Sequence, residues 1–290
     1  MSAPEVDESL PVVARRHPDW WITGVIALGF AVLLISALAS NEKLDWEVFA
    51  KYIVAAPILQ GLVVTIQLTL ISMLLAVTIG FLMASMAQSA NPVLRAIAKG
   101  YIGFFRGLPL LVLLLVTFNL ALFVPEFGIS IPGVIDASID TNDLISGFTA
   151  SIIGLALHES AFMAEIVRGG VLAVPAGQLE AAQSVGMTRW QAIRTIVYPQ
   201  AIRVIIPATG NQFIMLLKAS SMVAVIGGGD LLTRAQQIYG QNFKVIPLLL
   251  VVSFWYLVLV GVATFGQSIL EKRLARGAKA KPIATPEVVA

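Results

Sequence analysis

The chain of 290 residues is 58% hydrophobic and only 12% charged, whereas roughly one quarter of the residues in an average soluble domain are charged. This composition predicts an integral membrane protein, and the small net charge of +2 gives no sign of a surface that binds nucleic acid. The sequence contains no cysteine, which excludes disulfides, zinc sites with thiolate ligands and cysteine nucleophiles.

Six apolar segments are long enough to cross a membrane as helices, since about 20 largely apolar residues cover about 30 Å of hydrocarbon. Their apolar residues form continuous runs and do not alternate in the manner of barrel strands. We therefore predict an all-α bundle with spans at residues 20–38, 58–86, 97–122, 146–170, 203–227 and 246–270.

The first apolar segment allows two interpretations, because Ala37-Leu38-Ala39 at its end resembles a signal-peptidase site. The run is longer than an ordinary signal core, and acidic residues precede it beside the two arginines. We interpret residues 20–38 as an uncleaved, additional transmembrane helix that follows a cytoplasmic tail, residues 1–19. In either case the other five spans keep the same orientation.

Basic residues are distributed unequally between the two sides of the predicted bundle. With both chain ends inside, fourteen lysines and arginines lie in inner segments and four in outer loops, and Lys218 is left within the membrane. Cytoplasmic loops carry such an excess, so we expect both termini in the cytoplasm, including a tail at residues 271–290. The outer loops are short and contain no recognisable domain, so capture of a solute must be delegated to another protein.

A polar stretch, residues 171–202, separates the fourth and fifth apolar segments on the predicted cytoplasmic side. Pro175 is placed to begin a short helix, and Gly186 to end it in a left-handed conformation. Thr188 and Gln191 have the spacing of a capping box for a second short helix, which we expect to stop before Pro199. Such a helix pair predicts either docking of a soluble partner or an interfacial position among lipid headgroups.

The same stretch resembles the EAA loop in permease subunits of bacterial ATP-binding cassette importers, although Tyr198 replaces the leucine usual in that family. The resemblance implies a MetI-like permease core of five helices over residues 55–270, preceded here by one extra helix. It also implies that residues 171–202 dock into a groove of a cytoplasmic ATPase and transmit its movement to the spans. The residues that carry the resemblance are Glu180, Ala181, Ala182, Gly186, Ile196 and Pro199.

Three further segments, residues 104–115, 161–182 and 198–227, are similar to the branch of these permeases that takes up polar amino acids. Ala219 departs from that branch, whose members commonly have an acid at this position. The resemblance implies import of polar amino acids by alternating access. A permease for another small solute, such as an opine or a compatible solute, is the nearest alternative, followed by a self-sufficient secondary transporter and a membrane scaffold.

Polar residues within the predicted spans are candidates for the substrate pathway, because an ionisable group in mid-membrane costs about 2.5 to 3.5 kcal/mol on insertion scales. Glu159 and Lys218 could bind the ammonium and carboxylate groups of an amino acid, or they could neutralise each other across the bundle. The candidate pathway residues are His158, Glu159, Lys218, Asn211, Gln212 and Asn119. Near the inner face, we expect a structural or gating role for Arg106, Glu165 and Arg168.

The sequence contains no P-loop, since the dipeptide Gly-Lys never occurs, and we expect the glycine run at residues 227–229 to be a helix stop. We therefore predict that ATP and magnesium are used by a partner, and that this chain binds no cofactor or metal and is not an enzyme. By resemblance, the partners are an ATPase dimer, a second permease subunit that is identical or paralogous, and an extracytoplasmic solute-binding protein. The complex would lie in the lipid of a bacterial cytoplasmic membrane.

Overall fold

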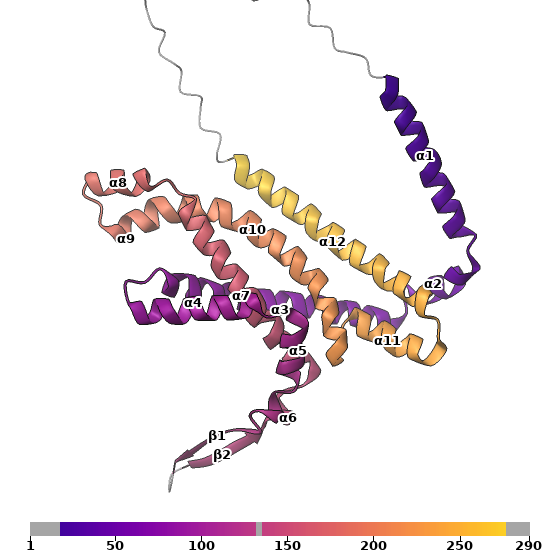
Figure 1. Ribbon diagram of the computed structural model, residues 1–290, viewed down its shortest axis with the longest axis horizontal. Coiled ribbons are helices and arrows are strands. Elements are labelled where there is room, and N and C mark those ends of the chain that lie inside the picture. Colours follow the sequence, from indigo (N-terminus) through magenta and orange to yellow (C-terminus); the bar gives the residue numbers. More distant parts are fainter. Residues whose placement is uncertain (1–17, 132–134, 277–290) are drawn as a thin grey trace, which may run out of the picture. The chain divides into compact units, whose positions relative to one another are not determined.

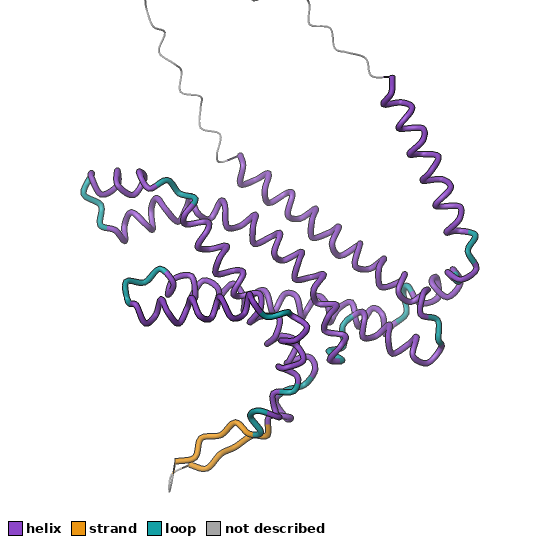
Figure 2. The backbone as a smooth tube through the Cα atoms, in the orientation of Figure 1, coloured by secondary structure: helices purple, strands orange, loops and turns teal. Residues whose placement is uncertain are grey.

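The computed structural model describes residues 18–131 and 135–276, which are mostly helical (Figure 1, Figure 2). Residues up to Trp46 form one unit and residues from Glu47 onward form another. The first unit contains helix α1, Pro18–Ala39, and a short 3₁₀ turn, Glu42–Leu44. Helix α1 coincides with the first predicted span and is long and apolar enough to cross a membrane. Most of the two predicted tails lies outside the described residues.

The second unit is a helical bundle with one small hairpin. Short turns at Leu120–Leu122, Ile193–Val197 and Ser220–Ile226 connect some of its elements. In chain order the elements are α2 Trp46–Tyr52, α3 Ala56–Ala87, α4 Pro92–Gly107, α5 Leu110–Phe118, β1 Glu126–Ile131, β2 Ile135–Asp140, α6 Thr141–Leu144, α7 Gly147–Leu172, α8 Ala176–Ser184, α9 Arg189–Ala192, α10 Tyr198–Ala219, α11 Leu231–Asn242 and α12 Val245–Arg276.

The described residues contain five helical segments that are long and apolar enough to cross a membrane, or six if the bent pair α4 and α5 counts as one span. Besides α1, these segments are α3, α7, the continuous stretch from Arg189 to Ile226, and most of α12. The count agrees with the predicted permease core and its additional N-terminal helix. Helices α3 and α7 pack together most extensively, and α10 lies beside both α7 and α12 (Figure 1).

The contact between α3 and α7 is close because a glycine lies in it. A Cβ atom added at Gly80 of α3 would lie 2.6 Å from the Cβ atom of Met163 and 2.9 Å from the carbonyl oxygen of Ser160 on α7. Small residues let helix backbones approach closely within membranes. Buried side chains such as Leu68 and Leu155 fill the core around this crossing, so the α3–α7 pair is the centre of the bundle.

We expect Gly80→Leu to destabilise the bundle strongly, because the added side chain would meet the backbone of α7. Overpacking of a core typically costs about 1–3 kcal/mol, and we expect a value at the upper end of this range. The measurement is the thermal midpoint of the purified protein in detergent. Gly103→Leu in α4 is the matched control, since an added Cβ there has no neighbour within 4 Å. Equal midpoints for the two variants would contradict the close contact.

The third predicted span is broken, so the prediction of one helix over residues 97–122 was wrong. Leu108 and Pro109 both have extended backbones, with ψ of 133° at each, and α4 and α5 meet at an angle of 102°. Proline disfavours the helical conformation in the residue before it and has no N–H to donate. Helix α5 has nine residues, which extend only about 14 Å, so it is too short to cross the membrane alone.

A β-hairpin follows α5, where we expected only a short loop. Strands β1 and β2 pair antiparallel, with Phe127 opposite Ile139 (Figure 2, orange). The Thr141 hydroxyl donates a hydrogen bond to the carbonyl oxygen of Val124 and so ties the two ends of the hairpin together. Each strand has only six residues. Its alternation of polar and apolar side chains is therefore hard to recognise in a sequence dominated by long apolar runs.

The fifth predicted span ends in a glycine turn, as expected. Gly227 follows the last helical turn with φ of +66°, a left-handed conformation that glycine adopts without steric cost. Asp230 then caps α11 by accepting hydrogen bonds from the N–H groups of Leu232 at 3.1 Å and Thr233 at 3.2 Å. Burial raises the pKa of the Asp230 carboxyl, because the loss of water outweighs the hydrogen bonds that favour its ionised form.

Candidate functional site

Helices α8 and α9 form the folded segment between α7 and α10, at the upper left of Figure 1. Helix α8 begins one residue after Pro175, and Gly186 follows its end with φ of +85°. The predicted capping box is present: the Thr188 N–H donates to Gln191 Oε1 at 2.9 Å, and the Gln191 N–H donates to Thr188 Oγ1 at 3.3 Å. The polar stretch is therefore an ordered element with its own caps.

The second helix of this segment continues into the fifth span, so the prediction that it stops before Pro199 was wrong. Residues Ile193–Val197 form a π-helical turn, and the N–H of Tyr198 donates to the carbonyl oxygen of Ile193. Proline has no N–H, and its ring clashes with the carbonyl four residues earlier in a regular α-helix. The wider π turn lets the helix pass through Pro199, and residues 189–226 form one continuous helical segment.

Some of the six residues that match the EAA loop pattern are buried within this loop, and the others are exposed. Ala182 is only 3% exposed and Ile196 is half-buried, so these two side chains help to hold the loop together. Trp190 on α9 is 64% exposed, which leaves a large aromatic surface uncovered on a cap-stabilised helix. The other residues of the set are exposed: Glu180, Ala181, Gly186 and Pro199.

Glu159 lies in the middle of α7 and is only 4% exposed. The side chain of Gln212 on α10 lies beside it, while Glu159 Oε1 has no hydrogen-bond partner among the described residues. A carboxylate oxygen that is buried without a partner is costly. Glu159 Oε1, between α7 and α10, can therefore accept a further hydrogen bond.

Lys218 does not form an ion pair with Glu159 in the parts of the chain that the structure describes. It lies six residues beyond Gln212 on α10, which corresponds to about 9 Å along a helix axis, and its side chain is exposed. The interpretation that the two charges neutralise each other within one chain is therefore not supported. Lys218 faces outward from this subunit at the end of α10.

The other predicted pathway residues make separate contacts. The ring of His158 lies 5.1 Å from that of Phe162, measured between centroids. The Asn119 side chain donates to the carbonyl oxygen of Leu115 at 2.8 Å, at the end of α5. Asn211 is exposed on α10. Of the six candidates, only Glu159 and Gln212 lie beside each other in the described structure; Glu159 is buried and Gln212 is half-buried.

Glu165 connects the elbow of the broken span with α7. The predicted pair with Arg168 is present, at 2.6 Å between Arg168 Nη2 and Glu165 Oε2. Arg106, at the end of α4, lies 3.7 Å from the same carboxylate oxygen, and its guanidinium lies 5.5 Å from the ring centroid of Phe162. The acid therefore joins two arginines from two helices, next to the bend after Gly107.

A polar contact next to Glu159 was not predicted from the sequence. The hydroxyl oxygens of Tyr101 on α4 and Ser160 on α7 lie 2.7 Å apart, one residue from Glu159. The two positions are separated by 59 residues, and no spacing rule connects residues so distant. Only the crossing of α4 over α7 brings them together.

Comparison with known proteins decides what kind of membrane protein has this geometry. Residues 76–276 match the family described as "Binding-protein-dependent transport system inner membrane component". The chain belongs to this family. This inner membrane component is 37% identical to the arginine transport system permease protein ArgU of Corynebacterium glutamicum over 271 residues, which cover 92% of the chain and 84% of ArgU.

Two solved structures match the inner membrane component. An amino acid ABC transporter with histidines matches with a TM-score of 0.65 and 35% identity, over 75% of this chain and 94% of that one. The MetNI methionine ABC transporter, in an inward-facing conformation, matches with a TM-score of 0.56 and 21% identity, over 75% of this chain and 95% of that one, and shows the fold alone. The protein is thus a multi-pass, MetI-like permease of the ABC importer class.

Proposed function

We propose that this permease forms the translocation pathway of an ATP-driven importer of polar amino acids. One observation carries the proposal: the continuous helical segment from Arg189 to Ile226 contains both the exposed Trp190 and Gln212, the partner of buried Glu159. One continuous helical segment therefore connects the loop outside the membrane to the neighbour of the acid within it. The names of ArgU, for arginine, and of the amino acid ABC transporter support this class of substrate.

The proposed mechanism assigns a role to each end of this segment. The cytoplasmic loop with Glu180 and Trp190 docks on a partner ATPase, which uses ATP and magnesium and supplies the energy. When the loop moves, the helix moves with it, and Gln212 shifts relative to Glu159. The free oxygen of Glu159 accepts a hydrogen bond from the ammonium or guanidinium group of the solute, and such charge-assisted bonds are the strong ones.

The complex contains further subunits in this proposal. A second permease, identical or paralogous, completes the pathway on the exposed side of α10, where Lys218 lies. An extracytoplasmic solute-binding protein delivers the amino acid. Both termini of the permease are cytoplasmic, because the excess of basic residues lies in the segments on that side.

A gentle-detergent pull-down of the tagged chain from its native membrane, followed by mass spectrometry, tests this proposal. We expect a P-loop ATPase, with any second permease, to be recovered in stoichiometric amounts. If the chain is recovered alone from a preparation that still transports, the importer assignment fails and a self-sufficient secondary transporter takes its place. Competition of uptake by arginine, glutamine, opines and compatible solutes then identifies the solute.

A further inference from the structure

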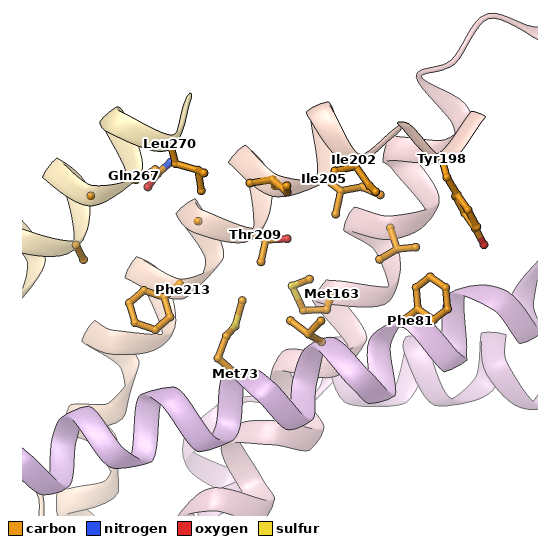
Figure 3. Close-up of a pocket in the computed structure, with 16 residues that line it drawn as sticks. Met73, Phe81, Met163, Tyr198, Ile202, Ile205, Thr209, Phe213, Gln267 and Leu270 are labelled. Atoms are coloured by element: carbon orange, nitrogen blue, oxygen red, sulfur yellow. The ribbon is translucent and has the colours of Figure 1, made fainter. Parts of the chain in front are cut away.

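A cavity of about 680 Å³ lies between α3, α7, α10 and α12 (Figure 3). Met73 of α3 lies opposite Phe213 of α10, Phe81 of α3 lies near Tyr198 at the other end, and Met163 of α7 lies between these ends. Its volume is in the range of about 300–1,000 Å³ that is typical of small-molecule pockets. Four membrane-crossing segments of the chain thus line a partly open space that the proposed transport path does not use.

The cavity is not suited to a polar amino acid. None of its sixteen lining residues is charged, and only Tyr198, Thr209 and Gln267 have polar side-chain groups. Gln267 Nε2 already donates to Glu271 Oε1 at 2.7 Å and lies 3.5 Å from the carbonyl oxygen of Pro207. An amino acid would lose its hydration here without gaining partners, which is costly for charged groups.

The cavity runs along the depth of the membrane and is longer than the hydrocarbon part of one leaflet. Its lining residues on α10 run from Tyr198 to Phe213, which corresponds to about 22 Å along the helix axis. A bilayer has about 30 Å of hydrocarbon, so that one leaflet contributes about half of it. In the orientation of the proposed function, Tyr198 lies at the inner surface, and the cavity extends from there past the middle of the membrane.

Two exposed arginines lie one helical turn beyond the lining residues, on the predicted cytoplasmic side. On α12, Gln267 and Leu270 line it, and Arg273 continues the same side of the helix one turn further. Arg194 lies one turn before Tyr198 on the other wall, and both arginines are exposed. Basic pockets between helices on the cytoplasmic side bind anionic lipid headgroups. The acid at this end, Glu271, is held by its hydrogen bond to Gln267.

We propose that the cavity binds an acyl chain of an anionic phospholipid from the inner leaflet, with the phosphate group near Arg194 and Arg273. The lining is apolar along the leaflet depth and basic at the headgroup depth, which is the polarity profile of such a lipid. A lipid chain also restores the van der Waals contacts that the lining side chains lack in an open gap. The inference rests on the proposed orientation of the permease.

The test is native mass spectrometry of the whole complex, purified in mild detergent and supplied with phosphatidylglycerol or phosphatidylcholine. We expect phosphatidylglycerol to remain bound, and Ala263→Trp, which fills the cavity from α12, to remove at least one lipid per permease. Val262→Trp is the matched control, because Val262 is adjacent on α12, does not line the cavity and is 67% exposed. Equal lipid retention by both variants overturns the proposal.

Two further results identify the occupant. The double variant Arg194→Gln, Arg273→Gln should reduce the preference for phosphatidylglycerol over phosphatidylcholine at least threefold, and an unchanged preference contradicts the headgroup assignment. Because the natural chain has no cysteine, Ile202→Cys gives a single thiol in the cavity. Mild oxidation in membranes then tests for a disulfide between two permeases. A covalent dimer through this thiol would show that a second copy of the chain, and not a lipid, occupies the cavity. Lipid retention remains measurable even if the complex proves not to import amino acids, so the two proposals can fail separately.

Discussion

Glu180→Arg is expected to reduce ATP-driven uptake at least tenfold while the bundle stays folded. Glu180 is exposed on α8, outside the apolar segments, so its replacement removes no core contact. At a docking surface, reversal of a charge places like charges opposite each other, and this costs several kcal/mol. ATP hydrolysis by the assembled complex should then no longer respond to the solute and its binding protein. Uptake and ATPase activity in proteoliposomes measure both effects.

Ala90→Arg is the matched control for this variant. It introduces the same charge at an exposed position of the other loop on the same side, between α3 and α4, and we expect uptake near that of the natural protein. Size-exclusion chromatography must show that both variants are folded. If a well-expressed Glu180→Arg protein retains normal uptake, the docking role of residues 171–202 is wrong and an interfacial position of the loop is favoured.

Glu159→Gln is expected to raise the KM for a cationic amino acid about ten- to hundredfold. The substitution keeps the shape of the side chain and its contact with Gln212 but removes the charge. A hydrogen bond to a charged group contributes roughly 1.5–3 kcal/mol, which corresponds to this range. We expect a smaller shift for glutamine, whose side chain is neutral. The measurement is the concentration dependence of uptake for arginine and glutamine in the reconstituted complex.

Glu165→Gln is the matched control, since it is the same substitution on the same helix. Glu165 is engaged with Arg106 and Arg168, so its replacement should weaken the connection between α4 and α7 and lower the thermal midpoint. We expect little change in the ratio of arginine to glutamine uptake. The reverse pattern, with Glu159→Gln losing stability and keeping its solute profile, would show that Glu159 is a structural acid.

The positions of the spans could be predicted because the bilayer imposes a length and a polarity on each of them. Residues 58–86 and 146–170 correspond closely to α3 and α7 for this reason. Local features were also accessible, such as the capping box of Thr188 and Gln191, because all of its atoms lie within four residues of sequence. The family could be inferred from the register of Glu180, Gly186 and Pro199, and the match over residues 76–276 confirms it.

The features that the sequence did not predict have three physical origins. At Leu108 and Pro109 the prediction followed the continuous apolar run and ignored the proline, so it missed the bend of 102° between α4 and α5. At Pro199 the opposite happened: the proline signal was followed, although a π turn can carry a helix through it. The contacts of the pathway form a third class. The contact between Glu159 and Gln212 depends on how α7 and α10 cross, and composition and periodicity do not determine that crossing.

The π turn at Ile193–Val197 has a consequence for how the two ends of its helix are oriented. Such a turn holds one residue more than an α-helical turn, and each residue of an α-helix rotates the chain by about 100°. The side of the helix on which Trp190 lies is therefore offset by that angle from the side it would occupy in an uninterrupted helix ending at Gln212. The angle about the helix axis between the Trp190 side chain and the Gln212 side chain therefore depends on the single residue that the π turn inserts between them.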